Sequence, residues 1–315
     1  MASIIPSYPN ATDPRSPLKI APITGRIGAV IDDVLVSGDI DQETIQAIEA
    51  AVVKHKVVFF RGQHHMTNED HEEFGAQFGH PGARISGPVA QDSRYLIELD
   101  RKEEFAPASW QTDETYLEAP PKSSILRAIA VPEAGGDTLW ANTETAYETL
   151  PESLRQLANG LRAVHSNEHD HAASFARAQD EEPTRVGIQR SVIASTIHET
   201  EHPLVWVHPV SGQRSLVLGR FFKRFVGLTQ NESESLFRIF QAHITRPENV
   251  VRWRWQPGDV AFSDNRATQH RAVADYGLQR RSLRRFSVEG DTPVGIDGQL
   301  SLTLRKERTF SSQHA

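Results

Sequence analysis

The stretch Val251-Arg252-Trp253-Arg254-Trp255 alternates apolar and charged side chains, and this period of two predicts a β-strand with one buried face. Residues 257–259, Pro-Gly-Asp, predict a turn into a second apolar strand at 260–262. Further apolar runs predict strands at 57–60, 124–129, 205–208 and 215–218. Many separated strands with a few peripheral helices are typical of a jelly roll, or double-stranded β-helix, which can hold a ligand between its sheets. We therefore expect a mainly β fold.

Four segments predict the peripheral helices. They begin near Asp41, Thr67, Thr143 and Thr229. Thr67 and Thr229 are each followed three residues later by an acid, Asp70 and Glu232 respectively. This is the pattern of a capping box, in which both side chains bond the first turn of the helix. Apolar residues then recur at helical spacing, so one face of each helix should pack against the sheets.

Composition limits the kinds of protein that this chain can be. Its 315 residues, 38% of them hydrophobic, suffice for one large core, and no repeat or linker divides them. We expect a single domain, 1–315, with mobile ends at about 1–16 and 305–315. The net charge of −7 and the lack of a sustained Lys/Arg stripe argue against nucleic acid or an anionic membrane as partner. The absence of cysteine excludes disulfides and thiolate metal sites. Without a signal peptide or an apolar span, a cytoplasmic protein is expected.

Two distant motifs carry metal-binding side chains. Trp110-Gln111-Thr112-Asp113 supplies a carboxylate, and the stretch 264–270, Asp-Asn-Arg-Ala-Thr-Gln-His, ends in His270. A histidine at position 111 would complete the two-His, one-carboxylate facial triad of non-haem Fe(II) oxygenases. Gln111 instead offers a neutral amide oxygen, which is a weaker donor to Fe(II). We expect metal affinity to fall, and the sequence leaves open whether useful iron binding remains.

The motifs together resemble a known family. Residues 110–116, 135–140, 264–270 and 281–285 follow the order and approximate spacing of the taurine/2-oxoglutarate dioxygenase family. The resemblance extends from about Leu18 to Gly298. Within the family the chain is similar to the alkylsulfatase dioxygenases, through residues 140–143, 164–168, 201–203 and 252–255.

The resemblance implies a role for each motif residue. Asp113 and His270 would ligate Fe(II), with Gln111 in the place of the family's first histidine. Thr138 and Arg281 would hold the distal carboxylate of the co-substrate 2-oxoglutarate. An arginine with a hydroxyl neighbour is a good carboxylate receptor, which agrees with that role. Arg285 would bind the anionic head of a small organic substrate and would act as the catalytic residue that orients it.

The implied reaction is that of an Fe(II)- and 2-oxoglutarate-dependent dioxygenase. It would use O2 to hydroxylate the carbon next to a sulfate ester or sulfonate, and would release an aldehyde, sulfate or sulfite, succinate and CO2. Family members are often homo-oligomers, so a dimer or tetramer is expected. Two alternatives stay open. One is an oxygenase acting on a non-sulfur, possibly zwitterionic, acid. The other is a metal-deficient and catalytically impaired homologue, because of Gln111.

Two further positions depart from the family pattern. Arg84 falls where relatives carry a histidine near the sulfo group, and its charge would preserve anion affinity. Glu114 follows the metal-binding aspartate, where the family usually has a small apolar residue. Glu114 is either an outward strand charge or a specificity residue that pairs with Arg84 or with a cation on the substrate. His202 and His208 flank a predicted strand and are expected to be structural.

Overall fold

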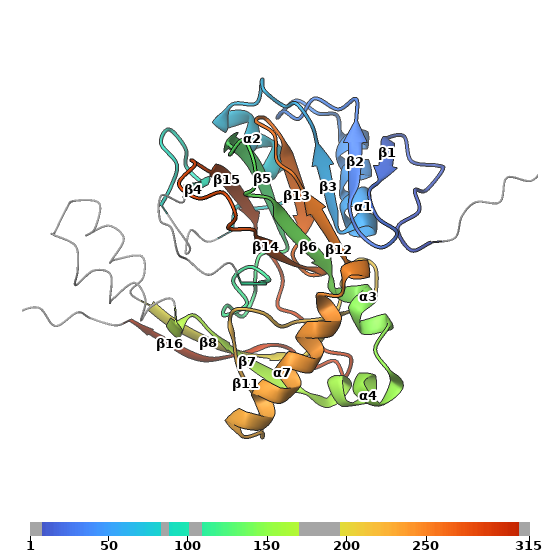
Figure 1. Cartoon of the computed structure of the whole chain (residues 1–315), viewed down its shortest axis with the longest axis vertical. Coiled ribbons are helices and arrows are strands. Elements are labelled where there is room, and N and C mark those ends of the chain that lie inside the picture. The colour runs from blue at the N-terminus through green and yellow to red at the C-terminus, as the bar shows by residue number, and fades with distance from the viewer. Residues whose placement is uncertain (1–7, 83–87, 101–108, 170–195, 309–315) are drawn as a thin grey trace, which may run out of the picture.

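The computed structural model describes residues 8–82, 88–100, 109–169 and 196–308. Its largest sheet has seven strands, which share one layer of Figure 1. In spatial order they are β1 (Lys19–Pro22), β2 (Ala29–Asp32), β3 (Val57–Phe60), β13 (Val260–Asp264), β5 (Ser123–Ala130), β15 (Ser282–Val288) and β4 (Ile97–Asp100). All neighbours are antiparallel except β2 and β3.

Three smaller sheets accompany it in the described part of the chain. One has the order β12 (Val250–Trp253), β6 (Thr138–Asn142) and β14 (Thr268–Ala272). A four-stranded sheet has the order β11 (Phe222–Phe225), β7 (Arg162–Ser166), β8 (Thr196–Pro203) and β16 (Leu302–Arg308). The last pairs β9 (Val205–Val207) with β10 (Arg214–Leu216). The expected mainly β jelly roll is confirmed.

The helices lie at the periphery, as Figure 1 shows. Among the described residues they are α1 (Gln42–His55), α2 (Asn68–Ala76), α3 (Thr143–Glu148), α4 (Glu152–Gly160) and α7 (Gln230–Ile244), with a short 3-10 helix at Pro247–Asn249. Both predicted capping boxes are present, at Thr67 with Asp70 and at Thr229 with Glu232. No helix in the described ranges is long and apolar enough to cross a membrane.

The alternating strand that predicted the fold joins two sheets through its aromatic face. Trp253 on β12 stacks on Phe59 of β3, with ring centroids 3.9 Å apart and planes 9° from parallel. Trp140 on β6 meets the same phenylalanine edge-on at 5.4 Å. These aromatic contacts fill the space between the large sheet and the three-stranded sheet, and such pairs stabilise a core beyond their buried area. The metal-motif strands β13 and β14 are thereby held in fixed positions.

Parts of both ends that the sequence predicted to be mobile are ordered. Asn10 is buried and donates from Nδ2 to the carbonyls of Thr24 and Gly28. At the other end, residues 305–308 belong to β16 and pair with β8. That expectation is therefore wrong for these residues, because long-range hydrogen bonds order segments that have no periodicity of their own. Residues 1–7 and 309–315 lie outside the described ranges.

Candidate active site

Gln111 and His270 face each other across an antiparallel bridge. The Gln111 N–H donates to the His270 carbonyl at 2.9 Å, and the His270 N–H donates to the Gln111 carbonyl at 2.7 Å. On its other side, His270 pairs with Trp140 of β6. The fold thus brings together the two predicted metal motifs, which lie far apart in the sequence.

Asp113 lies in a turn that directly follows the bridge. Glu114 has a φ of 54°, and the N–H of Leu117 closes the turn on the Glu114 carbonyl at 2.9 Å. Asn265 holds the Asp113 backbone at both polar atoms: its Oδ1 accepts from the Asp113 N–H at 2.8 Å, and its Nδ2 donates to the Asp113 carbonyl at 3.1 Å. A side chain from the other motif therefore satisfies backbone groups that the turn removes from the sheet.

Three side chains converge at this point. The distance from Gln111 Nε2 to Asp113 Oδ1 is 3.2 Å, and from Gln111 Nε2 to His270 Nε2 it is 3.3 Å. His270 Nε2 lies 3.6 Å from Asp113 Oδ1. Among the described residues there is no group of three or more His, Cys, Asp or Glu side chains that could hold a metal. Only Asp113 and His270 among the three converging side chains are of these types, and the third is the amide of Gln111.

The charges at the site favour an ionised carboxylate beside a neutral imidazole. Burial would raise the pKa of Asp113, but the positive charge of Arg285, the neighbouring His270 and a 2.9 Å hydrogen bond from Ser124 lower it below its ordinary value. Burial lowers the pKa of His270, although Asp113 opposes this shift. These are the protonation states in which both side chains can bind a metal ion.

Arg285 and Glu114 form a buried ion pair next to the converging side chains. Arg285 Nη1 lies 3.0 Å from Asp113 Oδ1, and Nη2 lies 3.3 Å from Glu114 Oε1. Glu114 is only 3% exposed, so the expectation of an outward strand charge is wrong. The turn is the reason, since the left-handed backbone at Glu114 directs its side chain to the same side as Asp113.

Arg281 and Thr138, which the family resemblance assigns to one carboxylate, form a second polar cluster. Arg281 is buried, and it donates from Nε to the Gly136 carbonyl at 2.7 Å and from Nη2 to Thr138 Oγ1 at 3.0 Å. Trp255 Nε1 also donates to Thr138 Oγ1, at 2.9 Å. The hydroxyl oxygen therefore accepts two hydrogen bonds, which leaves its own proton to be donated elsewhere.

The other arginines of the motif point to different partners. Arg280 is 64% exposed in its side chain and pairs with Asp100 at 3.1 Å. Arg284 pairs with Glu98 at 2.9 Å and is about one-fifth exposed. Arg281 and Arg285 are therefore buried, whereas Arg280 and Arg284 pair with acids of β4. Arg84, which was predicted to lie near the substrate, is outside the described residues.

Several supporting residues were not found by sequence reasoning. Asn265, Ser124 and Trp255 each hydrogen-bond a predicted site residue, but none carries a charge or a metal-binding group that would draw attention. The only available signal was their place inside or beside a motif. His202 is structural as expected: its Nε2 lies 2.6 Å from the Thr115 carbonyl, so it supports the turn that carries Asp113. His208 is structural too and bonds Asp264 at 2.9 Å.

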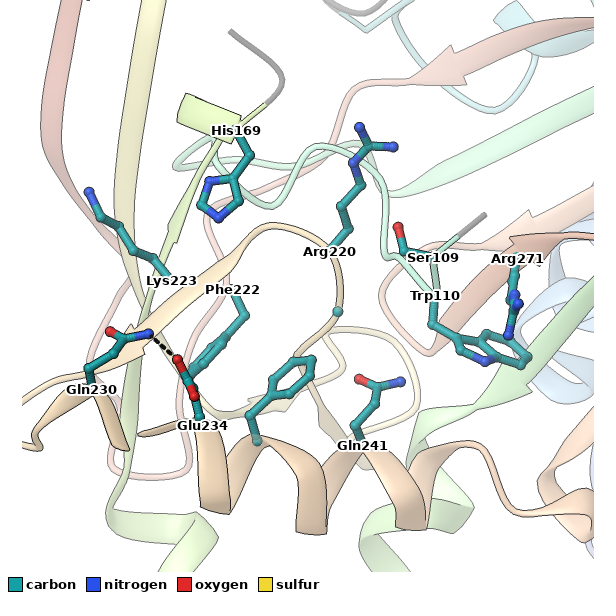
Figure 2. Close-up of a pocket in the computed structure, with 12 residues that line it drawn as sticks. Ser109, Trp110, His169, Arg220, Phe222, Lys223, Gln230, Glu234, Gln241 and Arg271 are labelled. Atoms are coloured by element: carbon teal, nitrogen blue, oxygen red, sulfur yellow. Dashed lines mark hydrogen bonds between the residues drawn. The ribbon is translucent and has the colours of Figure 1, made fainter. Parts of the chain in front are cut away.

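A pocket of about 490 Å³ lies beside the bridge, and none of the three converging side chains lines it. Trp110 and Arg271, the neighbours of Gln111 and His270, line it, together with α7 residues such as Gln241 (Figure 2). Successive side chains of a strand point to opposite faces, which is why the neighbours and the converging residues face different spaces. None of Asp113, Glu114, Arg281 or Arg285 lines this pocket.

Comparison with known families agrees with this arrangement. The family model described as "Taurine catabolism dioxygenase TauD, TfdA family" matches residues 19–287, which include both metal motifs and both inward arginines. The chain belongs to this family. The resemblance expected from the motifs is thereby confirmed, and so is the expectation of an enzyme of the dioxygenase class.

Relatives of this family member include proteins with sulfur-containing substrates. An alpha-ketoglutarate-dependent sulfate ester dioxygenase of Pseudomonas putida is 52% identical over 289 residues, covering 92% of this chain and 95% of the relative. An alkylsulfatase of Acinetobacter baylyi is 48% identical over 286 residues, covering 91% and 89%. The crystal structure of a taurine dioxygenase from Burkholderia xenovorans has a TM-score of 0.76 to this chain at 36% identity, covering 91% and 96%.

Proposed function

We propose that the protein is an Fe(II)- and 2-oxoglutarate-dependent dioxygenase that hydroxylates the carbon next to a sulfate ester or sulfonate. The observation that carries this proposal is the convergence of Asp113 and His270, 3.6 Å apart, beside the buried guanidinium of Arg285. The sulfate ester dioxygenase that is 52% identical over nearly the whole chain supports the choice of substrate. O2 and a small organic anion are the reactants expected.

The donor atoms of the site fit Fe(II), although less well than a full facial triad. Asp113 supplies a carboxylate oxygen and His270 a neutral imidazole nitrogen, both suited to this metal. Gln111 would supply its amide oxygen as a third, weaker ligand. When bound, iron provides the O2 chemistry that no side chain can supply. Ser124 and Asn265 would keep the Asp113 carboxylate in position for it.

Arg281 and Thr138 would hold the distal carboxylate of 2-oxoglutarate. The guanidinium is buried, and Gly136 and Thr138 fix its orientation. The Thr138 proton remains to be donated to the acid, because Trp255 and Arg281 both donate to the oxygen. A charged and a neutral donor that converge in a buried place make a specific carboxylate receptor.

Arg285 would orient the substrate by its anionic head and so select the C–H bond that reacts. Orientation of this kind accounts for much of the acceleration in an enzyme whose hard chemistry belongs to its metal. Hydroxylation of a carbon that bears a sulfate ester or sulfonate yields an unstable product, which collapses to an aldehyde and sulfate or sulfite. The co-substrate is converted to succinate and CO2. A cytoplasmic dimer or tetramer stays a prediction.

A second candidate rests on the buried pair of Glu114 and Arg285. Because Glu114 partly neutralises Arg285, a substrate that carries an amine as well as an acid would suit the site better than a simple anion. This candidate is an oxygenase on a zwitterionic acid, which need not contain sulfur.

The test is metal content followed by turnover. The protein is loaded with Fe(II) without oxygen, its bound iron is measured, and succinate is then followed with medium-chain alkyl sulfates, alkyl sulfonates and amino acids. Succinate release that depends on an alkyl sulfate supports the proposal, and release with amino acids alone favours the second candidate. Iron that binds without any substrate-dependent succinate would contradict both, and an iron-free protein would point to a metal-deficient homologue.

A further inference from the structure

The orientation of the Gln111 amide follows from the groups around it. Asp113 Oδ1 lies 3.2 Å from the nearer amide atom, and an ionised carboxylate can only accept hydrogen bonds. An amide oxygen at that distance would repel the carboxylate, so the atom that faces it must be the Nε2 donor. The identity of this atom is therefore settled by chemistry.

The same amide nitrogen also faces the imidazole. Gln111 Nε2 lies 3.3 Å from His270 Nε2, the nitrogen that lies 3.6 Å from Asp113 Oδ1. In the tautomer that carries its proton on Nδ1, Nε2 can accept the second amide hydrogen. One NH2 group thus contacts both Asp113 and His270, as a metal ion bound between these two side chains would.

Both oxygens of the Asp113 carboxylate are engaged by protein donors in this arrangement. Oδ1 accepts from Gln111 and is paired with Arg285 Nη1 at 3.0 Å, and Oδ2 accepts from the Ser124 hydroxyl at 2.9 Å. A buried carboxylate without donors would be costly, so these contacts stabilise the site when no metal is bound. A histidine at position 111 could not do the same, because its single ring donor could not reach both ligands at once.

We propose that Gln111 is a two-state residue that takes the place of the metal when the site is empty and becomes its ligand when the site is filled. In the empty site the amide nitrogen points inward and donates to Asp113 and His270. Rotation by half a turn about the Cγ–Cδ bond, a torsion with a broad energy profile, exchanges this nitrogen for Oε1 without moving the backbone. The amide oxygen then faces the metal. This inference rests on the proposed metal site.

The direct test observes the amide group itself. Full-length protein labelled with ¹⁵N is titrated with Zn(II), which is diamagnetic and suits the same donor atoms. The side-chain NH2 signals of Gln111 are assigned by their loss in Gln111→Glu. We expect slow solvent exchange of these protons in the metal-free protein, and a large shift with faster exchange as Zn(II) binds. Fast exchange before Zn(II) is added, or signals that do not move while Zn(II) binds, would overturn the proposal.

Three substitutions separate the two roles of the side chain. Gln111→Glu has the same shape but only acceptors, so it should destabilise the metal-free protein and bind Zn(II) more tightly. Gln111→Leu has neither donor nor acceptor, so it should lower both the metal-free melting temperature and the affinity for Zn(II). Gln111→His should tighten Zn(II) binding by at least about a hundredfold, because an imidazole nitrogen is a stronger ligand for Zn(II) than a neutral amide oxygen.

The comparison also distinguishes a failure of this inference from a failure of the metal site. If Gln111→Leu matches the unchanged protein in metal-free melting temperature and in Zn(II) affinity, the amide serves neither role and the inference is wrong. If Gln111→His and Gln111→Glu bind no Zn(II) either, the proposed metal site itself is wrong. Calorimetry and thermal unfolding provide both readouts without any turnover.

Discussion

Arg285 Nη2 lies 3.3 Å from Glu114 Oε1, and both side chains are buried. The same guanidinium contacts Asp113 through Nη1 at 3.0 Å, so one arginine serves two carboxylates. The arginine that is expected to bind the anionic head of a substrate is thus already partly neutralised by two carboxylates of the protein itself. The pair makes position 114 the strongest candidate for a residue that decides which acids enter the site.

Removing the charge of Glu114 should change substrate preference. We expect Glu114→Gln, which keeps the side-chain size, to tighten a medium-chain alkyl sulfate on the order of tenfold, because a negative charge leaves the path of an anion. The affinity for an amino-substituted analogue should fall. Calorimetric binding of both compounds at low and high salt measures this. Glu118→Gln, an exposed acid four residues further on, is the control. Unchanged affinities for both compounds in Glu114→Gln would remove the support for a zwitterionic substrate.

Arg281 should contribute far more than Arg280 to the binding of 2-oxoglutarate. A buried, charge-assisted contact contributes about 1.5–3 kcal/mol, so Arg281→Ala should weaken 2-oxoglutarate at least tenfold. Arg280 is exposed and paired with Asp100, and Arg280→Ala should leave the affinity unchanged. Titration of the metal-loaded protein under anaerobic conditions measures both. Equal losses in the two variants would mean that the assigned orientation of these arginines is wrong.

The hydrogen bond from Trp255 to Thr138 should matter only through the threonine hydroxyl. Trp255→Phe removes the indole N–H that lies 2.9 Å from Thr138 Oγ1. The Thr138 hydroxyl proton is then no longer oriented toward the carboxylate of 2-oxoglutarate. We therefore expect 2-oxoglutarate to bind several-fold more weakly, since one neutral hydrogen bond contributes about 1 kcal/mol. In a Thr138→Val background the same change should have no further effect. Additive losses in this double-mutant cycle would contradict the role given to Trp255.

Acid should destabilise the fold through the buried imidazole of His202. Burial lowers the pKa of His202 from 6.5 to about 4, so the unfolded chain takes up the proton first as the pH falls. The stability contributed by neutral His202 is complete above pH 6.5 and is lost as the pH falls to about 4. A shift of this size corresponds to about 3 kcal/mol.

Urea unfolding between pH 7 and pH 4 measures this effect. His202→Gln keeps a donor for the Thr115 carbonyl but cannot be protonated, so its free energy of unfolding should fall less steeply with acid. The exposed residue His64 supplies the control, and His64→Gln should retain the original slope. An identical pH slope in His202→Gln and the unchanged protein would exclude this histidine as a source of acid sensitivity.

Local patterns were sufficient for much of the fold. The alternation at residues 251–255 correctly predicted that Trp253 faces a core, and the capping boxes at Thr67 and Thr229 correctly predicted two helix starts. Such signals succeed because strand faces and helix caps depend on neighbours within a few positions. The residue types in the two metal motifs, together with the family resemblance, also named Asp113 and His270 before any geometry was known.

The direction of Glu114 was decided by tertiary structure alone. An extended strand would have turned it away from Asp113, but the chain leaves the strand there, at a φ of 54°. That turn is held by Asn265, which lies 151 positions further along the chain (265 − 114), and no local pattern encodes such a partner. The ordering of residues 305–308 by β8 has the same cause.

The sequence by itself determined which chemical groups this protein possesses, including the amide at position 111 in place of an imidazole. Only the tertiary structure decided what that amide contacts, because the bridge between Gln111 and His270 joins segments that are far apart in the chain. The residue type at each position is given by the sequence. The 3.2 Å distance between the amide nitrogen and Asp113 depends instead on the turn, on Asn265 and on the pairing of β14 with β6. Hydrogen bonds between segments that are distant in the sequence bring these side chains together in one site.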